Sequence, residues 1–193
     1  MRKALAAVAG VVVLLVLIGT LAGDDDTGTG DDIDDEVAEV VALGASAEEA
    51  ACAPVEHVQP IPQGPPHQAG SLDWPDAPPN NGVHNARTLR TLTRFYERED
   101  APSPEQAVHN LEHGIVIAWY DDELPDEEVD ALRRVAEAMP VKRFVAVPWS
   151  RRTFADDRHV VLTAWGHTQR CRRVSGRVFY EFTRTYADKD APE

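Results

Sequence analysis

Cysteine and basic residues are both scarce in this sequence, and each scarcity excludes a class of protein. Two cysteines in 193 residues are too few for a disulfide scaffold or a four-cysteine zinc site. The chain has 19 Lys and Arg against 33 Asp and Glu, and because phosphate binding needs a basic surface, nucleic acid is not an expected partner. The sequence also lacks a P-loop and a glycine-rich dinucleotide turn, so we expect no nucleotide cofactor.

Charged residues are absent from residues 4–23, most of which are Val, Leu, Ala or Ile. As a helix, this segment would span about 30 Å, the thickness of the hydrocarbon core of a bilayer. Arg2 and Lys3 precede it and three aspartates follow it, which predicts a single-pass signal-anchor at residues 1–23 with the rest of the chain outside the cytoplasm. A cleaved signal peptide that releases an exported protein is the alternative.

Lysine and arginine are also absent between Lys3 and Arg87, so most of the formal net charge of −14 lies in the first half of the chain. Residues 24–51 are rich in Asp, Gly and Thr at their start, a composition typical of a self-repelling, solvated segment. We therefore predict an acidic disordered linker at residues 24–51 and an extracytoplasmic globular domain at residues 52–193.

Proline marks the first part of that domain. Eight of the chain's 14 prolines fall in residues 54–79, and proline does not fit a regular helix or a central strand. Residues 52–83 are therefore predicted to be an extended, proline-rich arm, and residues 84–193 the core. Cys52 and Cys171 would join arm and core by a disulfide, since this bond is stable outside the cytoplasm.

Local signals within the core predict helices and strands. Ser103 suits an N-cap, Pro104 the first helical position and Gly114 the residue after the end, which predicts a helix over residues 103–113. The apolar run at residues 115–120 is typical of a buried strand. Further strands are expected at residues 143–148 and 159–165, and further helices from residue 125 and at residues 176–187. The predicted fold is α+β: a small sheet with helices packed on it, preceded by the arm and a transmembrane helix.

Histidines carry the only chemical pattern that we find. His109 and His113 are four residues apart on the predicted helix and so lie on one face, with Glu112 beside them. His84 follows the proline-rich turn and His67 lies in the arm. Imidazole and carboxylate groups suit Zn²⁺ or Cu²⁺. We therefore predict one divalent metal ion bound by His84, His109 and His113, with His67 or Glu112 as a fourth ligand or an outer partner.

Two other interpretations stay open from the residues alone. The His-x-x-Glu-His pattern also occurs in zinc peptidases, where Glu112 would be the general base and Glu181 an available third ligand. In a metal-free interaction domain, His109 and His113 would instead hydrogen-bond the arm to the core. The sequence indicates no substrate and no particular protein partner, and it does not decide whether the chain is an enzyme.

The span from about Cys52 onward resembles the bacterial domain of unknown function 3105 family. Members of this family often carry an N-terminal membrane segment, but the family is uncharacterised, so the resemblance implies no reaction. It implies that His84, His109, Glu112 and His113 converge. The matching features are the six residues 109–114 (His-Asn-Leu-Glu-His-Gly) with the apolar strand and Tyr120 after them, Pro78-Pro79 with Gly82 and His84, Ala164-Trp165-Gly166, and Pro192-Glu193. The chain departs from the family pattern at Asn80, Asn81 and Val83, within the proline turn.

Overall fold

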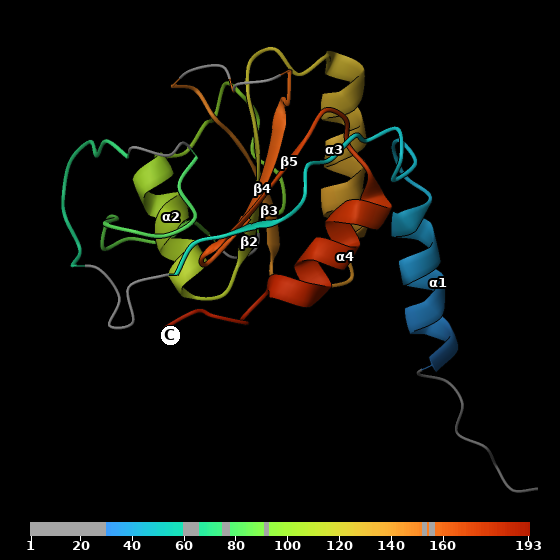
Figure 1. Cartoon of the computed structure of the whole chain (residues 1–193), viewed down its shortest axis with the longest axis horizontal. Coiled ribbons are helices and arrows are strands. Elements are labelled where there is room, and N and C mark those ends of the chain that lie inside the picture. The colour runs from blue at the N-terminus through green and yellow to red at the C-terminus, as the bar shows by residue number, and fades with distance from the viewer. Residues whose placement is uncertain (1–29, 60–65, 75–77, 91–92, 152–153, 155–156) are drawn as a thin grey trace, which may run out of the picture.

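A computed structural model of the chain describes residues 30–59, 66–74, 78–90, 93–151, 154 and 157–193. Its helices and strands come in an order that mixes the two types (Figure 1). In chain order they are α1 (Gly30–Val41), β1 (Glu56–His57), α2 (Pro104–Glu112), β2 (Val116–Tyr120), α3 (Asp126–Ala138), β3 (Phe144–Pro148), β4 (Val160–Ala164), β5 (His167–Cys171) and α4 (Gly176–Tyr186).

One five-stranded sheet lies at the centre, with the strand order β1-β5-β4-β2-β3. Strands β2 and β3 run parallel because α3 crosses between them, and the other three neighbouring pairs are antiparallel. Helices α3 and α4 cover one face of the sheet, and α2 covers the other (Figure 1). The predicted α+β fold with helices packed on a small sheet is therefore confirmed.

Because both faces of the sheet are covered, its central strands β4 and β2 are buried along their whole length. In β2 all five residues are buried. Ala118 packs into the cluster with α3 and α4, whereas Ile117 and Trp119 pack into the cluster with α2. This alternation divides the interior into two cores, and the α2 core is the one that supports the histidines.

The ends of α2 follow the local signals in the sequence. Ser103 is the N-cap residue, but its hydroxyl bonds to Glu105 Oε2 at 2.6 Å and makes no side-chain capping bond. Gly114 has φ = +76°, a conformation that favours glycine, and a Cβ there would collide with Asp188. The helix therefore ends at a fixed point, with Glu112 in its last turn.

Strand β5 was not expected, because its sequence His-Thr-Gln-Arg-Cys has no apolar run. It forms because Trp165 and Gly166, with φ = +76° at Gly166, make a tight turn that returns the chain along β4. Two parts of the proline-rich arm contact this strand and the turn before it. β1 pairs with it, and the Gly166 N–H donates to the Asn80 carbonyl at 3.0 Å.

Residues 30–51 differ from the disordered linker that their acidity indicated. α1 and the turns after it pack on α4, with Val40 and Ala50 fully buried. Two backbone hydrogen bonds hold the contact, from Ala45 N–H to Val174 O at 2.8 Å and from Gly176 N–H to Leu43 O at 2.9 Å. Within residues 35–51 Val40, Ala45 and Ala50 are buried while the acidic residues are exposed, so net charge did not predict the structure of this stretch.

Among the residues that the structure describes, no helix is long and apolar enough to cross a membrane. The predicted transmembrane segment, residues 4–23, lies outside the described residues, as do residues 24–29 of the predicted linker.

The arm and the core are joined covalently by the predicted cysteine pair. Cys52 Sγ lies 2.03 Å from Cys171 Sγ, and the two residues are separated by 119 positions in the sequence. Cys171 is the last residue of β5, so the bond holds the start of the arm at the strand along which the arm then runs.

We expect the Cys52→Ala/Cys171→Ala variant to lose about 2–4 kcal/mol of unfolding free energy, because the bond restricts the unfolded chain over a long loop. Equilibrium urea denaturation of the full chain without reductant measures the difference. Reductant should destabilise the parent and leave the variant unchanged, which serves as the control. Equal unfolding free energies for parent and variant would contradict the expectation.

Candidate metal centre

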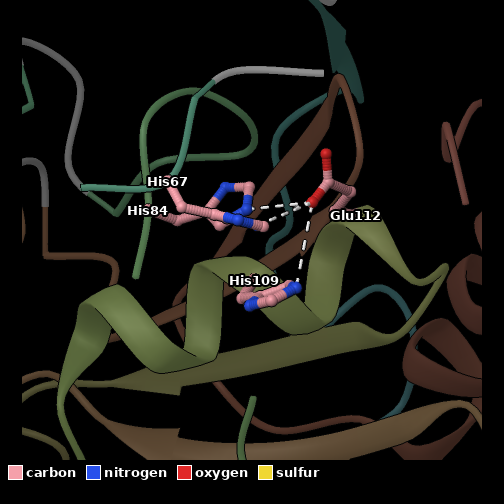
Figure 2. Close-up of side chains that lie close together, drawn as sticks. All are labelled: His67, His84, His109 and Glu112. Atoms are coloured by element: carbon pink, nitrogen blue, oxygen red, sulfur yellow. Dashed lines mark ion pairs between the residues drawn. The ribbon is translucent and has the colours of Figure 1, made fainter. Parts of the chain in front are cut away.

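Three histidines and one glutamate converge on the carboxyl-terminal half of α2 (Figure 2). His109 and Glu112 are three residues apart on the helix, so their side chains leave it on the same side. His67 and His84 lie on two extended segments that pair at a single parallel bridge. Figure 2 shows the three imidazoles around one oxygen of the Glu112 carboxylate.

Glu112 Oε2 is the common contact of the three rings. Its distances are 2.9 Å to His84 Nε2, 3.8 Å to His67 Nε2 and 3.9 Å to His109 Nε2. One nitrogen or oxygen atom from each of the four residues lies within 4.8 Å of all the others. Ligands bonded to zinc at about 2.0–2.1 Å in a tetrahedron lie about 3.3 Å apart, so the contacts of Glu112 bracket the spacing that a metal site requires.

Most of the cluster is shielded from water. The side chain of His84 is 0% exposed, that of Glu112 5% and that of His109 8%, whereas His67 is 44% exposed. Within the described part of the chain, His84 Nε2 and Glu112 Oε2 are buried without a hydrogen-bond partner, since their close contact is not directed as a hydrogen bond. Leaving such atoms unsatisfied costs about 1–3 kcal/mol each, so both fit the role of metal ligands.

The backbone selects the form of His84 that binds metals. Its Nδ1 lies 2.9 Å from the carbonyl oxygen of Gly82, and because a carbonyl only accepts, Nδ1 must carry a hydrogen. In the neutral ring Nε2 then has the free lone pair, and this nitrogen lies 2.9 Å from Glu112 Oε2. An imidazole that donates one N–H to a backbone carbonyl and offers its other nitrogen is the usual arrangement of a metal-bound histidine.

Electrostatics also keeps His109 in its neutral form. Burial is the main cause that lowers the pKa of His109, and the nearby His84 ring lowers it further, against a smaller opposite effect of the Asn85 carbonyl. Three imidazoles this close cannot all be protonated without strong repulsion. Neutral imidazole is the form that coordinates a metal, so the charge balance of the cluster favours a bound cation.

His113, which the sequence placed among the ligands, lies beside this group of four instead of within it. It is the C-cap residue of α2, and its side chain is 36% exposed. Its Nε2 lies 3.1 Å from His109 Nε2, and its Nδ1 lies 3.5 Å from Glu193 Oε2. The structure brings His67 and Glu112 to His84 and His109 in its place, because His113 lies one turn further along the helix, where α2 ends.

The peptidase interpretation required Glu181 as a third ligand beside the histidine motif. The ion pair of Glu181 is instead made within α4. It is exposed on α4 and pairs with Arg177 at 3.8 Å.

Asn110 has a role that sequence reasoning missed. Its Oδ1 accepts the Leu89 N–H at 2.6 Å, which holds the segment that follows His84 against α2.

Glu105 is a second residue that sequence reasoning missed. Its carboxylate accepts the Leu72 N–H at 2.8 Å and the Ser103 hydroxyl, and it pairs with Arg151. Burial alone would raise the pKa of Glu105, but these hydrogen bonds outweigh it and lower the pKa to about 2. The first turn of α2 thus holds the arm just beyond His67.

These features define a class of protein: an α+β domain with a buried histidine–glutamate cluster that could hold a metal ion. Residues 67–193 match a family model described as "Protein of unknown function (DUF3105)", and the chain belongs to this family. The matched region begins at His67 and contains the whole cluster, so the resemblance found in the motif is confirmed. No curated protein matches the chain, and no solved structure does.

The low pKa of Glu105 predicts a specific loss of stability in acid. Because its folded-state pKa lies below its unfolded value of 4.5, the stabilisation is fully present above about pH 4.5 and is lost as the pH falls toward 2. We expect Glu105→Gln to lower the unfolding free energy by about 2–3 kcal/mol at pH 7. At pH 3 this difference should shrink by more than half.

Urea denaturation of the parent and Glu105→Gln at both pH values measures the effect. Glu181→Gln, the same substitution on the exposed face of α4, is the matched control and should change stability by about 0.5 kcal/mol or less at either pH. A Glu105→Gln effect that is the same at pH 3 and pH 7 would show that the carboxylate is not ionised in the folded protein.

Proposed function

We propose that this chain binds one Zn²⁺ or Cu²⁺ ion through His67, His84, His109 and Glu112. The observation that carries the proposal is the fully buried His84, whose Nε2 lies 2.9 Å from the Glu112 carboxylate without a directed hydrogen bond. His84 Nε2 and Glu112 Oε2 are both acceptors when the ring is neutral, so they repel each other unless a positive charge lies between them. That charge is either a metal ion or a proton on Nε2.

The donor set supports a closed site. Three imidazoles and one carboxylate suit zinc or copper(II). Four protein ligands are typical of structural or storage sites, whereas catalytic zinc usually keeps one position open. His67, with a side chain 44% exposed, is the ligand through which an ion would enter or leave. We therefore favour a structural or metal-carrying role for the domain.

A small metal-dependent hydrolase fits the contacts less well. A general base has to stand next to the metal-bound water, but Glu112 lies in the ring of candidate ligands and contacts all three imidazoles. The metal-free interaction domain has a specific observation in its favour, because a protonated His84 could satisfy Glu112 as an ion pair at the same 2.9 Å. A chelator distinguishes the two states, because it destabilises a metal-bound cluster and leaves a His84–Glu112 ion pair unchanged.

Metal analysis of the full chain, made without a histidine tag, tests the proposal. After loading and dialysis, the parent should retain about one tightly held equivalent of zinc or copper. The His84→Ala/His109→Ala variant and Glu112→Gln should lose that equivalent, because each removes buried ligands. Glu181→Gln is the matched control and should retain it. A parent that stays metal-free after loading would end the proposal.

Thermal unfolding separates the metal state from the ion-pair state. A metal present at 100 times its dissociation constant stabilises the folded chain by about 2.7 kcal/mol, which is about 5–10 °C in Tm for a domain of this size. A chelator should remove this increment from the parent and leave the His84→Ala/His109→Ala variant unchanged. The metal-free interpretation predicts no chelator effect on either chain.

We also propose that the domain lies outside the cytoplasm, anchored by residues 4–23. The charge order around this segment supports the orientation, and the Cys52–Cys171 pair at disulfide distance supports an oxidising compartment. A protein partner at the membrane is unknown.

We expect the full chain, expressed in bacteria, to stay in washed membranes with residues 52–193 digestible from outside the cytoplasmic membrane. Leu14→Arg, in the middle of the apolar run, should reduce membrane retention, because an arginine there costs about 2.5–3.5 kcal/mol. Leu14→Ile is the matched control. A mature protein that begins after residue 20, detected by mass spectrometry, would instead support a cleaved signal peptide.

A further inference from the structure

A second histidine pair lies where the arm joins the sheet. His57 of β1 and His167 of β5 are direct partners across the antiparallel strand pair. Side chains at such positions point to the same face, with Cβ atoms about 5 Å apart. Their rings are stacked, with centroids 4.5 Å apart. The fold thus presents two imidazoles together, although the two residues are 110 positions apart in the sequence.

A carboxylate completes this group. Asp190, in the segment after α4, lies with its Oδ2 2.6 Å from His167 Nε2. One nitrogen or oxygen atom of each of His57, His167 and Asp190 lies within 4.8 Å of the other two. His57 and Asp190 are exposed, whereas His167 is only 5% exposed. The buried His167 therefore fixes the position of the group, and the side with His57 and Asp190 is open to solvent.

This group lies on the opposite face of the sheet from the cluster on α2. His167 is paired with Ala164 of β4, whose side chain packs into the core with α3 and α4. The His167 ring contacts Tyr186 of α4, with centroids 4.3 Å apart. The first cluster instead lies over α2, which covers the other face (Figure 1). The two groups share no residue, so a variant in one group leaves the ligands of the other in place.

We propose that His57, His167 and Asp190 form a second divalent metal site on the α4 face of the sheet, suited to Cu²⁺ or Zn²⁺. Two imidazole nitrogens and one carboxylate oxygen match the preferences of these ions, and Cu²⁺ binds most tightly in the general order of affinities. Water fills the remaining positions, because the side of His57 and Asp190 is open.

The surroundings indicate a weaker and more exchangeable site than the first. A hydrogen bond between His167 Nε2 and Asp190 Oδ2 already satisfies both groups, and a metal ion has to replace it. Lys189, next to Asp190 in the sequence, carries a positive charge, but its Nζ packs on the Tyr186 ring at 5.0 Å from the centroid. Only three protein ligands, two of them exposed, hold the ion here.

Copper titration of the full, tag-free chain tests this site by equilibrium dialysis and electron paramagnetic resonance. The parent should bind two equivalents of Cu²⁺, one tight and one weaker. His57→Gln and Asp190→Asn should each weaken only the second equivalent, by about tenfold or more, and reduce its nitrogen coupling in the case of His57→Gln. His57 is exposed, so His57→Gln should keep the parent's circular dichroism and Tm without metal, and Asp190→Asn should keep the circular dichroism.

Glu56→Gln is the matched control: it lies next to His57 on β1, points to the other face of the sheet, and should retain both equivalents. The His84→Ala/His109→Ala variant separates this proposal from the first, because it should keep the His57-dependent equivalent while losing the tight one. A parent that binds no second equivalent would overturn the second site. So would a second equivalent that persists unchanged in both His57→Gln and Asp190→Asn.

Discussion

The buried Glu112 carboxylate is the constraint on which the candidate centre depends. A charged group that is almost removed from water is costly unless positive charge compensates it. Its neighbours are three imidazoles, and burial and mutual repulsion keep at least His109 neutral. The cluster therefore needs either one proton, placed on His84 or His67, or one metal ion. Three neutral imidazoles and a carboxylate around a divalent cation satisfy every member at once, whereas a single proton satisfies only one contact.

The rest of the fold serves to deliver His67 and His84 to that carboxylate. In its described residues the proline-rich arm has only the two-residue strand β1, so it depends on single bonds at intervals. Cys52–Cys171 fixes its start, Glu105 holds Leu72, and the parallel bridge joins His67 to His84. Each of these bonds ends on β5 or α2, the elements on either side of the cluster, or within the cluster itself. The geometry of the centre therefore depends on the stability of the arm, because an arm that detaches takes candidate ligands away from Glu112.

Local signals predicted the helix, but only one of its two expected ligands belongs to the group of four. Ser103, Gly114 and the four-residue spacing of His109 and His113 can be read without knowing any other part of the chain. Whether His67 or His113 completes the group with His84 and His109 depends on where the arm meets α2, which no local pattern contains. The same holds for His57 and His167: their pairing follows from the register between two short, polar strands, and the sequence of β5 is not typical of a strand at all. The prediction of a disordered linker failed at residues 30–51 for a different reason. It rested on the acidic composition and overlooked the apolar residues that become buried, Val40 and Ala50.

The segment after α4 connects the two candidate centres. Asp188 N–H donates to the Gly114 carbonyl at the end of α2, Asp190 contacts His167 on the other face, and the Glu193 N–H donates to the Glu112 carbonyl. Figure 1 shows this segment crossing below the sheet from α4 toward α2. Its three carboxylates add negative potential beside both histidine groups, which favours cations at each. Asp190 can hydrogen-bond His167 or coordinate an ion beside it, so occupation of the second centre would act on the same short segment that meets the backbone of Glu112 at the first.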